Sequence, residues 1–208
     1  IHYLDLPQNF RMDLGGTFYI REMQRMAEGT AKITGIPLTS SRLRDSIRIY
    51  NANRAALASL VKARRERPWE IPTIEYYLLL RAGYMLPPEE HTAMVEDYLA
   101  LARQAGRQRK DNIRVLVRGA FCEQPPLGLL RTLERAGCYV VDDDFVLGTR
   151  MVHEAVDEDG DPFEALARAF MEHSLPTASK YDVRRNKSEL LIERSEERRV
   201  GKECRSRW

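Results

Sequence analysis

The sequence is poor in cysteine and contains no long apolar run. Its 208 residues include three cysteines, an odd number without a Cys-x-x-Cys pair, which argues against a secreted disulfide framework. An iron–sulfur cluster needs three or four thiolates, so this chain cannot hold one by itself. No segment approaches the roughly 20 uncharged apolar residues of a transmembrane helix, and no signal-peptide pattern opens the chain. We therefore expect a cytoplasmic protein that makes no membrane contact.

A charge excess of one sign is also missing. The chain has 33 Lys and Arg residues against 31 Asp and Glu residues, and five of the former and three of the latter fall within residues 195–208. The rest of the chain is therefore neutral, which argues against a nucleic-acid-binding surface. Residues 195–208 resemble a non-native read-through tail, with a genuine basic helix or a disordered arm as the alternatives. We exclude Cys204 in this segment from any site.

Residues 1–110 are expected to be a mainly helical segment with a strand remnant at residues 1–7. Glycine and proline positions predict helices over residues 18–31, 40–67, 73–82 and 88–104, with Thr39 as the N-cap of the longest one. Apolar or small residues recur along that helix near spacings of three, four and seven, which predicts one buried face: Leu43, Ile47, Tyr50, Leu57 and Val61. Its charged end, residues 64–67, is interpreted as solvated.

Residues 111–194 have a different pattern, which indicates a partial α/β domain. The β-branched run at residues 113–117 predicts a strand that is covered on both faces. A helix over residues 126–136 and a strand over residues 139–141 complete a βαβ unit, whose two strands should be parallel. A further helix should begin at Asp161-Pro162 and end near His173. The predicted fold class is therefore α/β: a helical segment followed by part of a parallel, Rossmann- or flavodoxin-like sheet.

Cys122 is the most informative single residue, because it follows the first predicted strand and precedes a predicted helix. Open α/β sheets usually place their chemistry at this carboxyl edge. A helix N-terminus would favour the thiolate, the form that ligates metals or attacks electrophiles. The alternative is a small buried apolar residue, a common role of free cysteine. Position alone leaves both interpretations open.

Five other polar residues are weaker candidates near the same edge. Three carboxylates at the end of the second strand could bind a cation, orient a helix N-terminus or raise one pKa by like-charge repulsion, or could form a solvated turn: Asp142, Asp143 and Asp144. Glu123 and Gln124 could contact a ligand, although polarity at a helix start explains them slightly better. Cys138 starts the second strand, at the opposite edge, and is interpreted as a core residue.

The segment GAFCEQPPLGLLRTLERAGCYVVDDDFVLGTR, residues 119–150, resembles the benzoyl-CoA reductase / 2-hydroxyacyl-CoA dehydratase family. Within the family it is most similar to the catalytic B- or C-type subunits of ATP-dependent benzoyl-CoA reductases. Three shorter pieces agree: HYLDLPQN at 2–9, IYNANRAAL at 49–57 and GDPFEALARAF at 160–170. The resemblance covers about residues 1–194, and its FCEQPP and GCYVVDDDF motifs are the most specific parts.

The resemblance implies a subunit of an oxygen-sensitive oxidoreductase that reduces the aromatic ring of benzoyl-CoA. Such subunits hold a [4Fe–4S] cluster, pair with a homologous catalytic subunit and receive ATP-driven electrons from separate activator subunits. By motif match, Cys122 would be one ligand of the cluster. The other ligands are expected outside these 208 residues, so this part alone should be inactive. The absence of a phosphate-binding P-loop agrees with ATP being hydrolysed by partner subunits.

Two other functions stay open. A 2-hydroxyacyl-CoA dehydratase subunit would use the same scaffold to eliminate water from its acyl-CoA substrate. A non-catalytic α/β interaction domain would use Cys122 only for packing, and would predict that Cys122→Ser changes stability by about 1 kcal/mol and nothing else.

Overall fold

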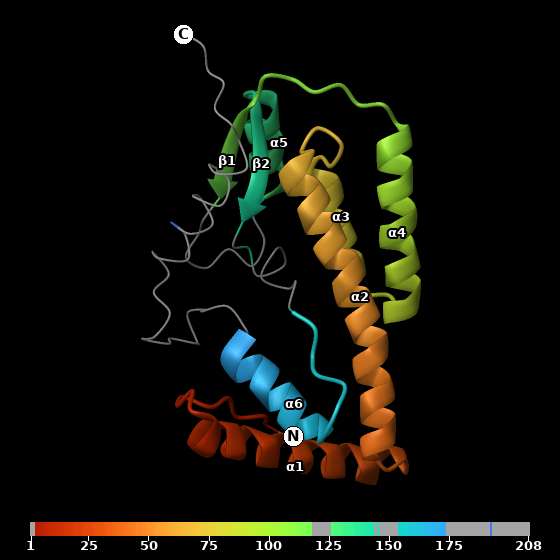
Figure 1. The fold of residues 1–208 in the computed structure, drawn as a ribbon, viewed down its shortest axis with the longest axis vertical. Coiled ribbons are helices and arrows are strands. Elements are labelled where there is room, and N and C mark those ends of the chain that lie inside the picture. Colours follow the sequence, from red (N-terminus) through yellow and green to blue (C-terminus); the bar gives the residue numbers. More distant parts are fainter. Residues whose placement is uncertain (1–2, 118–125, 144, 146–153, 174–191, 193–208) are drawn as a thin grey trace.

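A computed structural model describes residues 3–117, 126–143, 145, 154–173 and 192 (Figure 1). In chain order the elements are η1 (Met12–Gly16), α1 (Thr17–Thr34), α2 (Ser40–Glu66), α3 (Thr73–Ala82), α4 (Pro88–Gln104), β1 (Ile113–Val117), α5 (Leu127–Arg135), β2 (Cys138–Asp143), α6 (Pro162–Arg168) and η3 (Ala169–His173). The two η elements are single π-helical segments. No helix among these described elements is long and apolar enough to cross a membrane.

Helix α2 is the axis of the described part of the molecule and connects two regions at its two ends (Figure 1). We call the sheet-side region the second half of α2 with α3, α4, α5, β1 and β2. We call the α1-side region the first half of α2 with η1, α1, α6 and η3. In Figure 1, α1 and α6 lie across one end of α2, and the two strands lie beside the other end.

The sheet within the described residues has two parallel strands, as predicted, with α5 between them in sequence. Ile113 pairs with Cys138 at one end and Val117 pairs with Asp143 at the other. The register shifts between Val115 and Leu116, which pair with Val140 and Asp142, so Val141 is the extra residue of a bulge. The α/β class is confirmed, whereas a larger Rossmann- or flavodoxin-like sheet stays a prediction.

Local signals placed most helix ends correctly. The Thr39 hydroxyl accepts a hydrogen bond from the Arg42 N–H at 3.3 Å, and the Asp161 carboxylate accepts one from the Glu164 N–H at 2.9 Å. Both side chains thus satisfy a backbone donor that the first helical turn leaves without a partner. Gly35 ends α1 with a φ of 70°, a left-handed conformation that glycine adopts without steric cost.

The sheet-side region contains the main core. Eleven buried residues from α2, α3, α4 and the loop before α3 form one cluster: Ala56, Leu57, Leu60, Val61, Ala63, Ile71, Tyr76, Leu79, Leu80, Val95 and Ala102. His91 is also buried here, with Nδ1 3.0 Å from the Asn53 amide nitrogen and Nε2 2.9 Å from the Leu79 carbonyl oxygen. Histidine and asparagine therefore join α2, α3 and α4 in the interior.

Three expectations are corrected. Residues 3–11 form no strand, because side chains of α1 take up their backbone polar groups: Arg25 donates to the Tyr3 carbonyl at 2.8 Å, and Glu22 accepts from the Asp5 N–H at 3.3 Å. Tyr50 is about half exposed and does not belong to the buried face of α2. The end of α2 is not solvated throughout, because Arg64 is 1% exposed.

Candidate functional site

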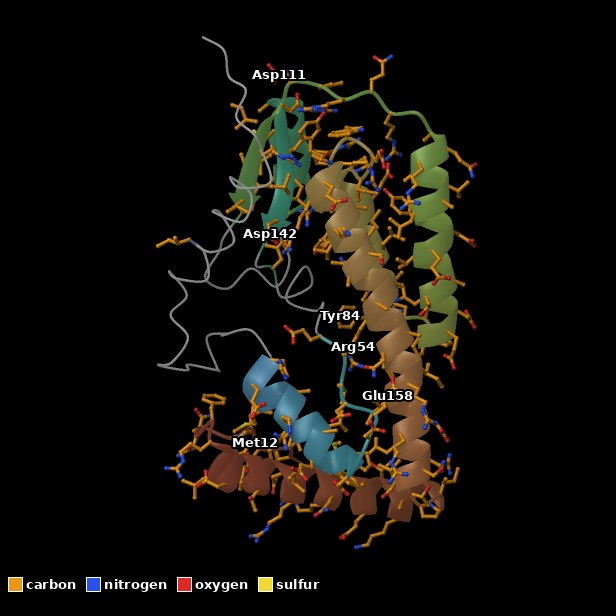
Figure 2. All side chains as sticks on the ribbon, in the orientation of Figure 1. Met12, Arg54, Tyr84, Asp111, Asp142 and Glu158 are labelled. Atoms are coloured by element: carbon orange, nitrogen blue, oxygen red, sulfur yellow. The ribbon has the colours of Figure 1, made fainter. Side chains whose placement is uncertain are left out.

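The candidate site lies at the carboxyl ends of β1 and β2, where the last turn of α2 approaches the sheet. Figure 2 shows Asp142 there, at the end of β2 and beside the end of α2. Parallel sheets of α/β proteins usually bind ligands beyond this edge. Val140, Asp142, Asp143 and Phe145 are buried around it, so the edge is an ordered part of the protein interior.

Arg64 of α2 is the centre of this site. Its Nε donates a hydrogen bond to the Val140 carbonyl at 2.8 Å, and its Nη1 donates to the Asp143 carboxylate at 2.6 Å. The guanidinium carbon lies 4.0 Å from the centroid of the Tyr76 ring, a cation–π contact. Burial alone would lower the pKa of Arg64, but the Asp143 carboxylate and Tyr76 outweigh burial and raise it. The guanidinium therefore stays charged in the interior.

Asp142 and Asp143 are 2% and 3% exposed, so the alternative of a solvated turn is wrong for both. Asp143 bonds to Arg64 through one carboxylate oxygen and accepts the Phe145 N–H through the other at 3.2 Å. Asp142 accepts the Asp143 N–H at 3.0 Å, and Arg65 approaches its second oxygen at 3.5 Å. Because arginine cations neutralise both carboxylates, these two residues hold the end of the strand to α2.

Two donors of this site have no acceptor within the described part of the chain: Nη2 of Arg64 and Nε of Arg65. Both atoms are buried, and buried N–H groups nearly always have a hydrogen-bond partner in folded proteins. Arg114 of β1 adds a further cation nearby, since its guanidinium donates to the Arg65 carbonyl oxygen. The edge therefore has spare donors and could bind an oxygen atom of a water molecule or of an anionic ligand.

The other sequence candidates are distributed differently. Cys122, Glu123, Gln124 and Asp144 lie outside the described residues, so their roles stay predictions. Cys138 starts β2 opposite Ile113, at the far end of the strand from Asp143. It is thus remote from the carboxyl edge, in the position expected for it.

Within the described ranges, no group of three or more His, Cys, Asp or Glu side chains could hold a metal ion. Cys138 is the only described cysteine, and the carboxylates of Asp142 and Asp143 are engaged by arginines. The described residues therefore do not fit an iron–sulfur cluster, and we derive no step of a reaction through one.

Family comparison agrees with the sequence motifs. The family model described as "2-hydroxyglutaryl-CoA dehydratase, D-component" matches residues 1–200. The chain belongs to this family. The resemblance inferred from the FCEQPP and GCYVVDDDF motifs is thereby confirmed.

Among curated relatives, this D-component family member is 43% identical to the C subunit of the benzoyl-CoA reductase of Thauera aromatica over 194 residues. It is 26% identical to the lactoyl-CoA dehydratase subunit beta of Anaerotignum propionicum over 193 residues. These alignments cover 93% and 91% of this chain, but 50% of each relative. The (R)-2-hydroxyglutaryl-CoA dehydratase subunit beta of Acidaminococcus fermentans is 29% identical over 169 residues, 81% of this chain and 44% of the relative. The D-component chain thus spans about half the length of these relatives.

Sequence reasoning missed Arg64 and Tyr76 as parts of the site. A signal for Arg64 was present, because it lies seven residues after Leu57 and four after Leu60, on the buried face of α2. An arginine at such a position in this family member must find a buried anion, and the acidic end of β2 was the obvious candidate. Tyr76 gave no comparable signal among the other apolar residues of α3.

Proposed function

We propose that this chain is part of a catalytic subunit of a benzoyl-CoA reductase, an oxygen-sensitive oxidoreductase that reduces the aromatic ring of an aryl-CoA thioester. The observation that carries the proposal is the identity pattern: 43% to the reductase subunit, against 26% and 29% to two dehydratase subunits. In this role the protein pairs with a homologous catalytic subunit and receives electrons from ATP-hydrolysing activator subunits.

The structure contributes one supporting feature to this proposal. The carboxyl edge of the sheet is held by the buried Arg64–Asp143 pair and has spare guanidinium donors beside it. Preorganised cationic donors suit the binding of an anionic or oxygen-bearing substrate group. An acyl-CoA thioester has phosphate, carbonyl and amide oxygens that could use them.

The second candidate is a 2-hydroxyacyl-CoA dehydratase subunit, because its relatives match over nearly the same part of the chain. Two matched chimeras separate the candidates. In one, this chain replaces the matching half of the Thauera aromatica reductase subunit; in the other, it replaces the matching half of the lactoyl-CoA dehydratase subunit beta. Each chimera is assembled without oxygen with the remaining subunits of its host enzyme.

We expect the reductase chimera to consume benzoyl-CoA in the presence of ATP and a low-potential reductant, and the dehydratase chimera to be inactive. The opposite pattern would transfer the proposal to the dehydratases. If both chimeras assemble and neither is active, the non-catalytic interaction domain is the remaining interpretation.

Cys122 is proposed as one ligand of a [4Fe–4S] cluster, on the motif match at FCEQPP. Cys122→Ser in the active chimera should remove iron and activity together while the helical circular dichroism is unchanged. Cys138→Ser is the matched control and should retain both. Iron at the unsubstituted stoichiometry after Cys122→Ser would refute the ligand assignment.

A further inference from the structure

An open groove of about 390 Å³ lies in the α1-side region, between α1, the loop after it, α2 and α6. Helix α1 lines it with one face, through residues spaced three or four apart: Met23, Ala27, Thr30 and Thr34. Leu43 of α2 and Phe163 of α6 form the opposite wall. The carboxyl edge of the sheet lies at the other end of α2 (Figures 1 and 2), so the groove is separate from the candidate site.

The groove exposes apolar side chains that a protein normally covers. Three of its large apolar residues are about half exposed: Met26 at 46%, Ile36 at 51% and Leu38 at 43%. Among the described residues that line it, Arg42 is the only charged one, and no described residue accepts a hydrogen bond from the Arg42 guanidinium. Contiguous exposed apolar surface of this kind marks an interaction site.

The core beneath the groove is thin. Its fully buried apolar cluster consists of Ile47, Val156 and Ala165, with Leu43, Leu166 and Ala169 packed against it. Leu43 and Leu166 also line the groove. The same side chains therefore form both the edge of the core and the floor of an open surface, as expected where one layer of the fold is missing.

We propose that this groove is the docking surface for the half of the longer polypeptide that this chain lacks relative to its relatives. The matched region makes up 50% of the Thauera aromatica reductase subunit, so a part of about equal size must pack against it. The occupying segment should present apolar side chains to the groove and an acceptor oxygen to Arg42. This inference depends on the family relationship and not on the reaction proposed above.

The test follows the reactivity of introduced thiols. Met26→Cys and Ile36→Cys are made separately, in this chain alone and in the chimera with the Thauera aromatica reductase subunit. Met85→Cys is the matched control, because Met85 is 85% exposed and lies in the sheet-side region. The rate of alkylation by iodoacetamide is measured by mass spectrometry of the peptides that contain each position.

We expect positions 26 and 36 to react about tenfold or more slowly in the chimera than in the isolated chain, since a covered thiol reacts only when the interface opens. Position 85 should react equally in both. Equal rates at positions 26 and 36 would overturn the proposal. Slow, concentration-dependent reaction in the isolated chain would also overturn it, by assigning the groove to a second copy of this chain.

A chimera that fails to fold, seen as a loss of helical circular dichroism, would be replaced by the unaltered Thauera aromatica reductase subunit. Cysteines are then placed at the positions of that relative that align with Met26 and Ile36. Slow alkylation there supports the docking surface, and reaction at the rate of an exposed thiol overturns it. Neither result depends on whether the enzyme is a reductase or a dehydratase.

Discussion

The two ends of α2 are packed in different ways, although both carry the same amphipathic pattern. Its second half enters an eleven-residue core and ends in a buried ion pair with β2. Its first half contacts a cluster of three buried apolar residues beside an open groove. The comparison shows that an apolar stripe establishes which face of a helix is buried, while the number of elements packed against that face determines how completely.

Polar contacts compensate in part for the thin core of the α1-side region. The Asn51 side chain accepts the Val156 N–H at 2.9 Å and donates to the Val156 carbonyl at 2.7 Å, as a neighbouring strand would. The rings of Tyr19 and Phe170 add an aromatic contact between α1 and η3, with centroids 4.9 Å apart. Such contacts attach the segment before α6 to α2 without burying much apolar surface.

The largest expected effect is the loss of the buried ion pair in the sheet-side region. Arg64→Met should lower the free energy of unfolding by about 3–5 kcal/mol, because it leaves the Asp143 carboxylate buried without its cation. Urea denaturation monitored by circular dichroism measures the change. Arg65→Met is the control: Arg65 is more exposed and lies 3.5 Å from Asp142, so it should cost about 1 kcal/mol or less. Equal losses for both variants would contradict the central role of Arg64.

A pair of core truncations compares the two regions directly. Leu60→Ala, in the large cluster, should cost about 4 kcal/mol, near the upper end of the range for such changes. Ile47→Ala, in the small cluster beside the groove, should cost about 2 kcal/mol, since neighbours at an open surface can relax into the vacated space. Urea denaturation of both variants tests the difference, and a larger loss for Ile47→Ala would reverse the comparison.

The interior of the sheet-side region should also be sensitive to added volume at Gly83. A Cβ atom at Gly83 would lie 2.6 Å from Cε1 of His91, and His91 is held on both sides by hydrogen bonds. Gly83→Ala should therefore destabilise the protein by about 1–3 kcal/mol, as measured by thermal unfolding. Gly128→Ala is the matched control, because open space surrounds that helical glycine. It should be neutral or stabilise by up to about 1 kcal/mol.

The smallest effect concerns Tyr98, which donates to Glu75 at 2.7 Å. Burial, followed by the hydrogen bond to Glu75, raises the pKa of Tyr98 above the ordinary value of about 10. The folded state thus keeps the proton that the unfolded state loses, so this stabilisation is complete below about pH 10 and declines as the pH rises further. Tyr98→Phe should cost about 1 kcal/mol at neutral pH and make the alkaline decline of stability shallower.

Denaturation midpoints of Tyr98→Phe across neutral and alkaline pH test this expectation. Tyr50→Phe is the control, since Tyr50 is about half exposed and should change neither the midpoint nor its pH dependence. An unchanged alkaline decline in Tyr98→Phe would show that other tyrosines cause it.

Much of the fold could be predicted because its signals are local. The helix over 73–82 and the strand over 113–117 were predicted at the bounds that the structure has, and the parallel pairing followed from the helix between the strands. The candidate site was predicted less completely. The acidic end of β2 was identified, but its arginine partners lie 77 and 79 residues earlier in the chain. No local pattern encodes a partner at that separation.

The sequence by itself determined the family, the helix caps, the order of the elements and the carboxyl edge where Asp142 and Asp143 lie, because each depends on neighbouring residues or on a motif. Only the tertiary structure decided that these aspartates are buried and paired, that Arg64 is an interior residue, and that α1, α2 and α6 leave an apolar groove open. These outcomes depend on which elements pack together, and the free energy of a buried charge or an apolar surface is set by the groups around it.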